Sequence, residues 1–170
     1  MIEITTKLGR FTIREATPAD APAIARLHVE TFRETHGGGP TLEIRLSQWT
    51  DILSKGDPND FAFLVIDADQ TAVGFTRGVV SDGREFHGVL NKIYLLRRVQ
   101  KHGLGRAVLH VTIERFVKMG LRSMHLNGWA ENPNNGFYEH FGGERLVSPD
   151  GEFHGGYVWN DLPRALSDHF

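Results

Sequence analysis

The sequence contains no cysteine, and this absence removes several kinds of chemistry at once. A chain without thiols forms no disulfide, holds no thiolate-bound metal and offers no cysteine as a nucleophile. Long apolar runs are missing too, since no stretch reaches the ~18 residues that cross a bilayer as a helix. The opening residues Met1–Glu3 are not typical of a signal peptide. We therefore expect a cytoplasmic protein without a membrane partner.

A strong excess of charge of either sign is absent as well. The formal net charge is −2, so bulk electrostatics favour neither a nucleic-acid partner nor a membrane surface. Hydrophobic residues make up 40% of the chain and charged residues 24%, which is ordinary for a globular protein. The length of 170 residues suits one domain, and we expect residues 1–170 to form a single domain. A basic cluster within 97–106 is therefore a local feature.

Apolar periodicity and glycine or proline breaks predict a mixed α/β chain. The run Thr17-Pro18-Ala19-Asp20 is typical of a helix start, with a capping threonine and an acid in the first turn. The expected element order is β-α-α-β-β-β-α-β-α-β-β. The predicted strands are 9–14, 61–67, 71–80, 85–96, 122–129, 143–147 and 156–162, and the predicted helices are 17–36, 41–54, 104–119 and a short helix within 131–142.

The stretch Gln100–Arg106 joins a predicted strand to a predicted helix through a glycine-bearing turn. The first N–H groups of such a helix have no partner within the helix, and the helix dipole adds positive charge there. Gly103 and Gly105 let a ligand approach the backbone closely. The turn therefore predicts an anion site, most often for phosphate. Its basic side chains are Arg97, Arg98, Lys101, His102 and Arg106.

Two other readings of this turn stay open at this level. It is not a Walker loop, because no Gly-Lys-Ser/Thr follows, and it is not a GxGxxG dinucleotide motif. An ordinary strand-to-helix turn with a solvated basic rim fits the heptapeptide as well. A site for another phosphate ligand, such as a nucleotide, also fits.

Two separate segments carry a resemblance to a known family. The strand Ile93-Tyr94-Leu95 followed by Gln100-x-x-Gly103-x-Gly105 resembles the cofactor motif of the GNAT N-acetyltransferase superfamily. About thirty residues later, Asn132–Glu144 resembles the second signature of that family, with an asparagine, a Phe-Tyr pair and a closing Gly-Gly. The order of elements is similar over residues 10–162. The resemblance implies a GNAT-like α/β fold, with a mostly antiparallel sheet splayed between strands 85–96 and 122–129.

The resemblance also implies acetyl-CoA, or another acyl-CoA, as the co-substrate of an N-acyltransferase. The backbone of 100–106 would hold the pyrophosphate, and Leu95 and Leu96 would pair with the pantetheine arm. The Leu95 N–H would donate to the thioester oxygen, Asn132 would hold the strand end or the pantetheine, and Tyr138 would act as general acid near the sulfur. The cofactor-binding residues so implied are Leu95, Leu96, Arg97, Gln100, Lys101, His102, Gly103, Leu104, Gly105, Arg106, Asn132 and Tyr138.

The chain departs from the family at positions that matter for the chemistry. Arg97 stands where many members have proline. Val89 and Asn91 stand where well-studied members carry a glutamate or histidine base, so that base is not transferred to this chain. His87 and Glu85 are the remaining candidates, because a strand with period two places them on the same face. Without a cysteine nucleophile, acyl transfer would be direct, in a ternary complex.

The acceptor is expected to be a small-molecule or peptide amine. Glu30, His36 and Trp49 are the candidate substrate-binding residues of the acceptor side. Phe153 and His154 could add an aromatic wall, whereas core packing is expected for Trp159. None of the nine histidines shows an H-x₃-H or HExxH pattern with a carboxylate, so no metal site is predicted. A homodimer through the C-terminal strands is a further possibility.

Two functions remain in competition with an N-acyltransferase. The missing strand base favours a non-catalytic acyl-CoA sensor on the same fold. The basic turn alone is also compatible with a nucleotide site. Competition between ATP and acetyl-CoA for binding would distinguish a nucleotide site from an acyl-CoA site.

Overall fold

A computed structural model describes residues 1–81 and 87–170. The predicted mixed α/β architecture is confirmed, with two elements added at the ends of the chain. The strands are β1 (Ile2–Thr6), β2 (Gly9–Glu15), β3 (Asp60–Asp67), β4 (Ala72–Val80), β5 (Gly88–Leu95), β6 (Met124–Leu126), β7 (Glu144–Val147) and β8 (Phe153–Trp159). The helices are α1 (Ala21–His36), α2 (Leu42–Ser54), α3 (Leu104–Lys118), α4 (Asn135–His140) and α5 (Leu162–His169), with 3₁₀ turns η1 (Pro18–Asp20) and η2 (Arg97–Val99).

The two added elements are β1 and α5, neither of which the apolar pattern predicts. β1 pairs antiparallel with β2, from Ile2 opposite Ile13 to Thr6 opposite Gly9. At the other end, the expected strand 156–162 is wrong in its last residues. The Asp161 carboxylate accepts a hydrogen bond from the Arg164 N–H at 3.2 Å, which is an N-cap, and α5 begins at once.

The strands are hydrogen-bonded in the order β1-β2-β3-β4-β5-β6-β8-β7. β2 pairs antiparallel with β3, and β8 pairs antiparallel with both β6 and β7. β5 and β6 pair in parallel at two positions, Gly88 opposite Met124 and Val89 opposite His125. β6 covers only Met124–Leu126 of the predicted strand 122–129, so the parallel contact is short.

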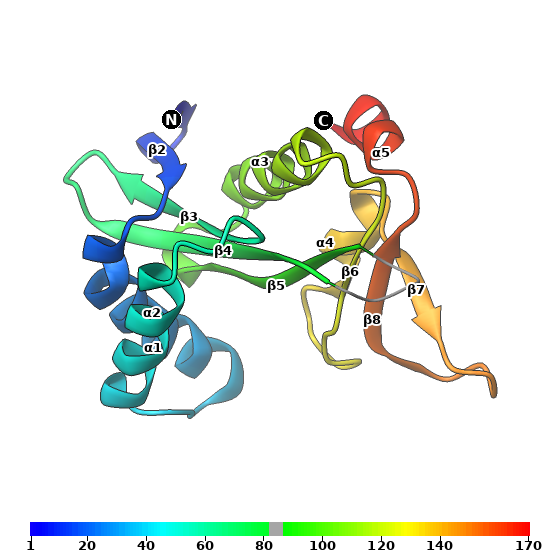
Figure 1. Ribbon diagram of the computed structural model, residues 1–170, viewed down its shortest axis with the longest axis horizontal. Coiled ribbons are helices and arrows are strands. Elements are labelled where there is room, and N and C mark those ends of the chain that lie inside the picture. The colour runs from blue at the N-terminus through cyan, green and yellow to red at the C-terminus, as the bar shows by residue number, and fades with distance from the viewer. Residues whose placement is uncertain (82–86) are drawn as a thin grey trace. The chain divides into compact units, whose positions relative to one another are not determined.

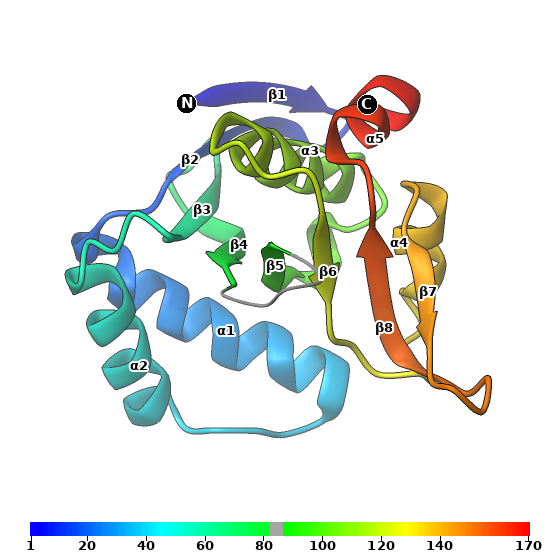
Figure 2. The ribbon, with the colours of Figure 1, turned by 45° about the vertical axis from the view of Figure 1, so that its right-hand side comes forward.

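The chain forms two compact units, which we describe separately. The first unit comprises residues 1–77 and 92–109. In this unit α1 and α2 lie side by side against one face of the sheet, and the start of α3 lies on the other face (Figures 1 and 2). The core of the unit is apolar and fully buried, and includes Ile13, Ile24, Leu64, Phe75 and Leu104.

The start of α1 is fixed by the acid that the sequence predicts. The Asp20 carboxylate accepts hydrogen bonds from the Thr17 N–H at 2.7 Å and from the Arg14 guanidinium at 2.7 and 2.8 Å. The hydrogen bond from Arg14 is the largest of the causes that lower the pKa of Asp20 to about 2. The capping prediction for 17–20 is therefore confirmed.

The second unit comprises the described residues of 78–91 together with 110–170. Phe116, Met124, Tyr157 and Trp159 are buried in its core. The Trp159 indole N–H donates to the Phe141 carbonyl at 2.8 Å, which confirms core packing for this tryptophan. In the described part of the chain, no helix combines the length and the apolar character needed to cross a membrane.

We expect Leu104→Ala to destabilise the fold by about 2–5 kcal/mol, because Leu104 is completely buried and its truncation leaves a cavity at the first residue of α3. Leu46→Ala is the matched control, since Leu46 lies on α2 with 37% of its surface exposed. Urea unfolding followed by tryptophan fluorescence gives both values. Equal losses in the two variants would contradict the assignment of Leu104 to the core.

Candidate active site

One backbone N–H at the end of β5 points away from β4. The Leu96 N–H donates to the Val73 carbonyl of β4 at 2.9 Å. Neighbouring residues of an extended strand direct their N–H groups to opposite sides, so the Leu95 N–H points away from β4. The Leu96 N–H was expected to pair with the pantetheine arm, but it is already bonded to β4. The Leu95 N–H has the orientation that the pantetheine prediction requires.

The backbone N–H groups at the start of β5 and just after its end bond to different parts of the chain. The Gly88 N–H donates to the Ser123 carbonyl at 3.0 Å, just before β6, whereas the Leu96 N–H donates to β4.

The turn after β5 is held in place by hydrophobic anchors and by one side-chain amide. Leu96, Val99 and Leu104 are buried, so the turn is fixed at its start, middle and end. The Gln100 side-chain N–H donates to the Leu95 carbonyl at 2.8 Å. Gln100 therefore links the turn to the strand end, with the Leu95 carbonyl as its acceptor.

The backbone of the turn has the conformation of an anion site. Lys101 and Gly103 both have positive φ angles, of 64° and 87°. The first helical bond of α3 runs from the Ala107 N–H to the Gly103 carbonyl at 3.1 Å, so the preceding N–H groups are not used by the helix. No heavy atom lies within 4 Å of the position that a Gly103 Cβ would occupy. These donors and this space fit a phosphate group.

The basic side chains around the turn are not equivalent. Lys101 and Arg106 are exposed and His102 is half-buried. Arg97 is directed at α1 instead, because its N–H donates to the Glu34 carboxylate at 2.9 Å and its guanidinium donates to the Glu34 carbonyl. The role of Arg97 at the turn is thus to attach it to α1, and its use as a phosphate ligand would require these bonds to break.

The second signature forms a turn followed by α4 in the second unit. The Asn132 side-chain oxygen accepts the Asn134 N–H at 2.9 Å, so Asn132 shapes the turn. Asn135 bridges the chain after β6, since its amide N–H groups donate to the carbonyls of Trp129 at 3.1 Å and Ala130 at 2.8 Å. The strand-end role predicted for Asn132 is therefore filled largely by Asn135, which the sequence analysis missed.

Tyr138 lies on α4 among aromatic side chains of the second unit. Its ring contacts those of Phe137, Tyr157 and Trp159, with centroids 5.4, 5.3 and 6.3 Å away. The side chain is half-buried, so packing fixes the ring while part of the residue reaches the surface. The role of Tyr138 as a general acid stays a prediction.

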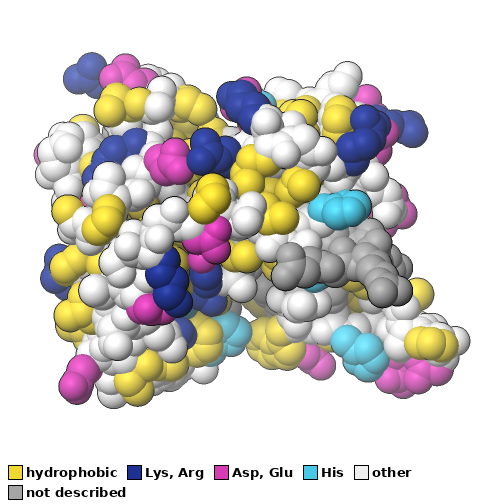
Figure 3. All heavy atoms as spheres, viewed as in Figure 1, with side chains coloured by type: hydrophobic (Ala, Val, Ile, Leu, Met, Phe, Trp, Pro, Cys, Tyr) yellow, Lys and Arg dark blue, Asp and Glu magenta, His cyan; other side chains and the backbone are white. Residues whose placement is uncertain are grey.

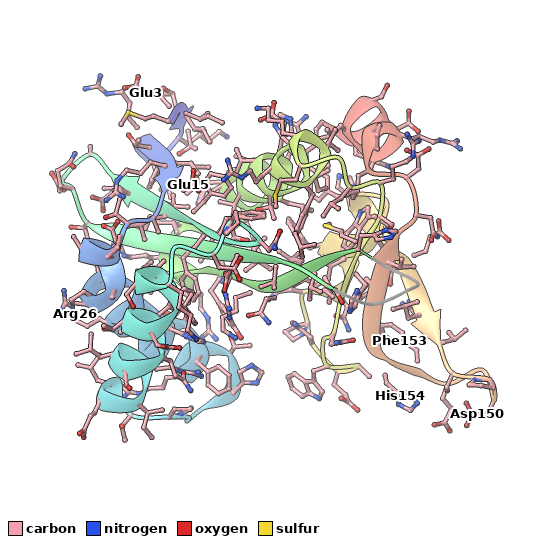
Figure 4. All side chains as sticks on the ribbon, in the orientation of Figure 1. Glu3, Glu15, Arg26, Asp150, Phe153 and His154 are labelled. Carbon is pink, nitrogen blue, oxygen red and sulfur yellow. The ribbon has the colours of Figure 1, made fainter. Side chains whose placement is uncertain are left out.

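The candidate bases and acceptor-side residues are spread over the chain. His87 is exposed, with its carbonyl bonded to the Ser81 N–H at 2.7 Å, and Glu85 lies outside the described residues. Glu30 and His36 are exposed on α1, where the His36 ring packs on Phe32 at 4.3 Å. Phe153 and His154 lie at the start of β8 in the second unit (Figure 4), where Arg145 covers the Phe153 ring at 4.8 Å.

Trp49 is not a surface for substrate, because it is only 1% exposed. Its indole N–H donates to Nδ1 of His28 at 3.1 Å, so it positions a buried histidine instead. The His28 ring also contacts Phe75 at 5.2 Å and Tyr94 at 5.5 Å. The predicted substrate-binding role of Trp49 is therefore wrong, because its side chain is buried and bonded to His28 within the first unit.

Charged residues surround this buried histidine. Burial lowers the pKa of His28 to about 3, and the positive charges of Arg45 and Lys92 act in the same direction. Burial also lowers the pKa of Lys92, with smaller contributions in the same direction from Arg45 and Arg77. The sequence analysis missed this group, although a lysine inside the apolar run 89–96 was a visible signal. Within the described residues, no group of three His, Asp or Glu side chains is placed to hold a metal.

The sequence and the fold of this chain are similar to those of known proteins. A model of the acetyltransferase (GNAT) family matches residues 21–142. The chain belongs to the GNAT acetyltransferase family. It is therefore an acetyltransferase enzyme, with acetyl-CoA as its co-substrate.

Individual relatives of this GNAT protein agree with the family assignment. The chain is 29% identical to YuaI of Bacillus subtilis (strain 168), an uncharacterized N-acetyltransferase, over 167 residues that cover 89% of this chain and 94% of YuaI. The PaiA N-acetyltransferase from Thermoplasma acidophilum, solved in complex with coenzyme A, has a TM-score of 0.70 at 17% identity, covering 88% of this chain and 98% of PaiA. The spermidine/spermine N-acetyltransferase SpeG from Vibrio cholerae has a TM-score of 0.64 at 16% identity, covering 92% and 96%.

The low pKa of His28 predicts acid sensitivity of this GNAT fold. Between its ordinary pKa of 6.5 and the folded value of about 3, the unfolded chain binds a proton that the folded chain does not. The free energy of unfolding therefore falls as the pH drops through this window, by up to about 1.4 kcal/mol per pH unit. We expect His28→Gln to lose less free energy of unfolding than the wild type between pH 6 and 4, as measured by urea unfolding.

The control for this measurement is Asp20→Asn. The Asp20 carboxyl has an ordinary pKa of 3.8 and a folded pKa of about 2, so its contribution is present above pH 3.8 and is lost as the pH falls toward 2. Asp20→Asn should therefore keep the wild-type slope between pH 6 and 4. A His28→Gln slope parallel to wild type in that interval would refute the assignment.

Proposed function

We propose that this GNAT enzyme transfers the acetyl group of acetyl-CoA to a primary amine by direct attack in a ternary complex. The observation that carries the proposal is the arrangement of β5 and its following turn. The Leu95 N–H points away from β4, and the anion-binding backbone of 100–106 begins a few residues later in the same unit. The Leu95 N–H would bind the pantetheine arm of CoA, and the backbone N–H groups of the turn would bind its diphosphate.

In this proposal the backbone of Lys101–Arg106 holds the diphosphate, with Lys101 and Arg106 adding positive charge at the surface. The pantetheine arm lies along the Leu95 side of β5. The Leu95 carbonyl is already bonded to Gln100, so the strand offers the arm its N–H at this position. That N–H also donates to the thioester oxygen.

The chemistry requires a neutral amine and a stabilised oxyanion. The amine nitrogen forms a bond to the carbonyl carbon, and the C–S bond breaks when the tetrahedral species collapses. An N–H aimed at the oxyanion contributes about 2.7–4 kcal/mol in comparable sites. Tyr138 donates a proton to the leaving sulfur, and general acids of this kind add about 10²-fold. The proton lost by the amine passes to solvent or to a base such as His87.

Two features of the chain are compatible with direct transfer rather than a cysteinyl enzyme intermediate. The sequence has no cysteine that could carry the acyl group. The candidate base His87 is exposed, so water can relay a proton to it. The acceptor in this scheme is a small-molecule or peptide amine.

We expect Gly103→Ala to weaken CoA binding at least ~10-fold, because a Cβ residue disfavours the φ of 87° that shapes the turn. Gly120→Ala is the matched control. Gly120 has a φ of 83° and equally open space, but it ends α3 away from the turn. Both variants should lose similar stability, and isothermal titration calorimetry should find CoA affinity reduced in the first alone.

A thermal-shift assay separates a CoA site from a nucleotide site. ATP carries phosphates without a pantetheine arm, so it should shift the melting temperature much less than CoA does. A shift by ATP equal to that by CoA would overturn the pantetheine assignment for Leu95.

We expect Tyr138→Phe to lower kcat about 10²-fold while the Kd for CoA changes less than threefold, because only the proton donor is lost. Tyr157→Phe is its control, since the Tyr157 hydroxyl donates to Glu139 at 2.8 Å and has no catalytic role in the proposal. It should lower stability and leave kcat intact. A fully active Tyr138→Phe enzyme would remove Tyr138 from the mechanism. A protein that binds CoA yet acetylates no amine would instead be a sensor.

A further inference from the structure

We propose that the acceptor amine of this enzyme carries an anionic oxygen group, a carboxylate or a phosphate-like group, which His28, Arg45 and Lys92 bind together. The inference rests on the proposed function and specifies the substrate class of the same site. All three residues belong to the first unit, and they come from α1, α2 and β5. His28 and Arg45 each bury a nitrogen that has no hydrogen-bond partner in the described structure.

His28 presents one such donor. Its Nδ1 accepts the hydrogen bond from the Trp49 indole at 3.1 Å, so the proton of the neutral ring lies on Nε2. His28 is 1% exposed, and its Nε2 has no hydrogen-bond partner in the described structure. Buried polar atoms are nearly always paired, so an orphan donor of this kind points to a bound molecule that the protein itself does not supply.

Arg45 presents a second donor of the same kind. It is 8% exposed and lies over the Phe32 ring at 5.3 Å, which fixes its guanidinium plane. One nitrogen donates to the Gln48 side-chain oxygen at 3.0 Å, whereas Nε has no partner in the described structure. Among the described residues no carboxylate forms an ion pair with Arg45, although buried arginines normally have one.

Lys92 adds a second positive charge on the neighbouring strand. It is half-buried on β5, and within the described chain it forms no ion pair. The nearby Arg77 differs, because its guanidinium is bonded to both oxygens of Asp60, with Nε to Oδ1 at 2.8 Å. Arg77 is thus neutralised within the protein, while Arg45 and Lys92 are not. Lys and Arg side chains gather beside α2 on the surface seen in Figure 3.

These observations favour an anion over a neutral or cationic group. Two charges held near each other with little water are unfavourable unless an opposite charge joins them. A carboxylate or a phosphate accepts several hydrogen bonds and matches the planar guanidinium. The neutral imidazole of His28 then serves as a fixed N–H donor, and its low pKa keeps it neutral at physiological pH. A polyamine acceptor would instead bring further positive charge to Arg45 and Lys92.

The position of the cluster also limits the size of the acceptor. Tyr94 of β5 contacts His28, and Lys92 lies on the same strand face two residues earlier. Leu95, whose N–H is assigned to the thioester oxygen, lies three residues beyond Lys92, which is ~10 Å along an extended strand. The long lysine side chain shortens this span. An amine and an anionic group separated by a few bonds, as in an amino acid, therefore suit the site.

The test compares amines that differ only in the anionic group. An amino acid, the amino alcohol of the same skeleton and the corresponding aminophosphonate are assayed with acetyl-CoA at pH values where each amine is equally deprotonated. We expect kcat/KM at least ~10-fold higher for one of the two anionic acceptors than for the amino alcohol. The better of the two identifies the group as carboxylate or phosphate-like.

Arg45→Gln should make kcat/KM for the anionic acceptor nearly equal to kcat/KM for the neutral acceptor, a ratio close to one, mainly by raising KM for the anionic acceptor. Arg26→Gln is the matched control, because Arg26 is exposed on α1 (Figure 4) and should leave the ratio unchanged. If Arg45→Gln does not fold, Lys92→Gln replaces it, since Lys92 is only half-buried and the same fall in the ratio is expected.

The outcomes separate this inference from the proposed function. Amines acetylated without preference for an anionic group, or a preference that survives Arg45→Gln and Lys92→Gln, would overturn the anion subsite and leave amine acetylation standing. If CoA binds but no amine in the panel is acetylated, both proposals fall together.

Discussion

The hydrogen bond from the Leu96 N–H to the Val73 carbonyl is the constraint on which the active-site region depends. It holds the last residue before the turn against β4 and thereby turns the Leu95 N–H outward. The buried side chains of Leu96, Val99 and Leu104 then fix the course of the following backbone. A close approach of β4 makes this possible, since a Cβ on Gly74 would lie 2.2 Å from the Leu95 side chain.

Much of the fold could be predicted from sequence because its signals are local. The cap formed by Thr17 and Asp20, the glycine break after α1 and the turn at 100–106 all depend on neighbours within a few residues. The end of β8 could not be predicted in this way. The run up to Leu162 is apolar enough for a strand, but the Asp161 carboxylate captures the Arg164 N–H and begins a helix. The helix cap formed by Asp161 therefore decides the structure at this position, and the apolar pattern of the run does not.

The surroundings of His28 were less predictable because their contacts are distant in sequence. His28 lies on α1 and Trp49 on α2. The indole is buried and bonded to the imidazole only because these two helices pack together. The consequence reverses the role expected for Trp49. Its indole N–H bonds to Nδ1 of His28, so the proton of the neutral imidazole lies on Nε2. The surroundings of Lys92 likewise follow only from the folded chain. Arg45 lies near Lys92, and Asp60 is bonded to Arg77.

The bond from the Gln100 amide to the Leu95 carbonyl has a consequence beyond the placement of the turn. An exposed strand edge normally presents donors and acceptors together, which lets any extended peptide add to the sheet and seeds aggregation. Here the Leu95 carbonyl is bonded within the chain by the Gln100 amide. An extended peptide therefore finds no acceptor at Leu95 with which to begin a ladder.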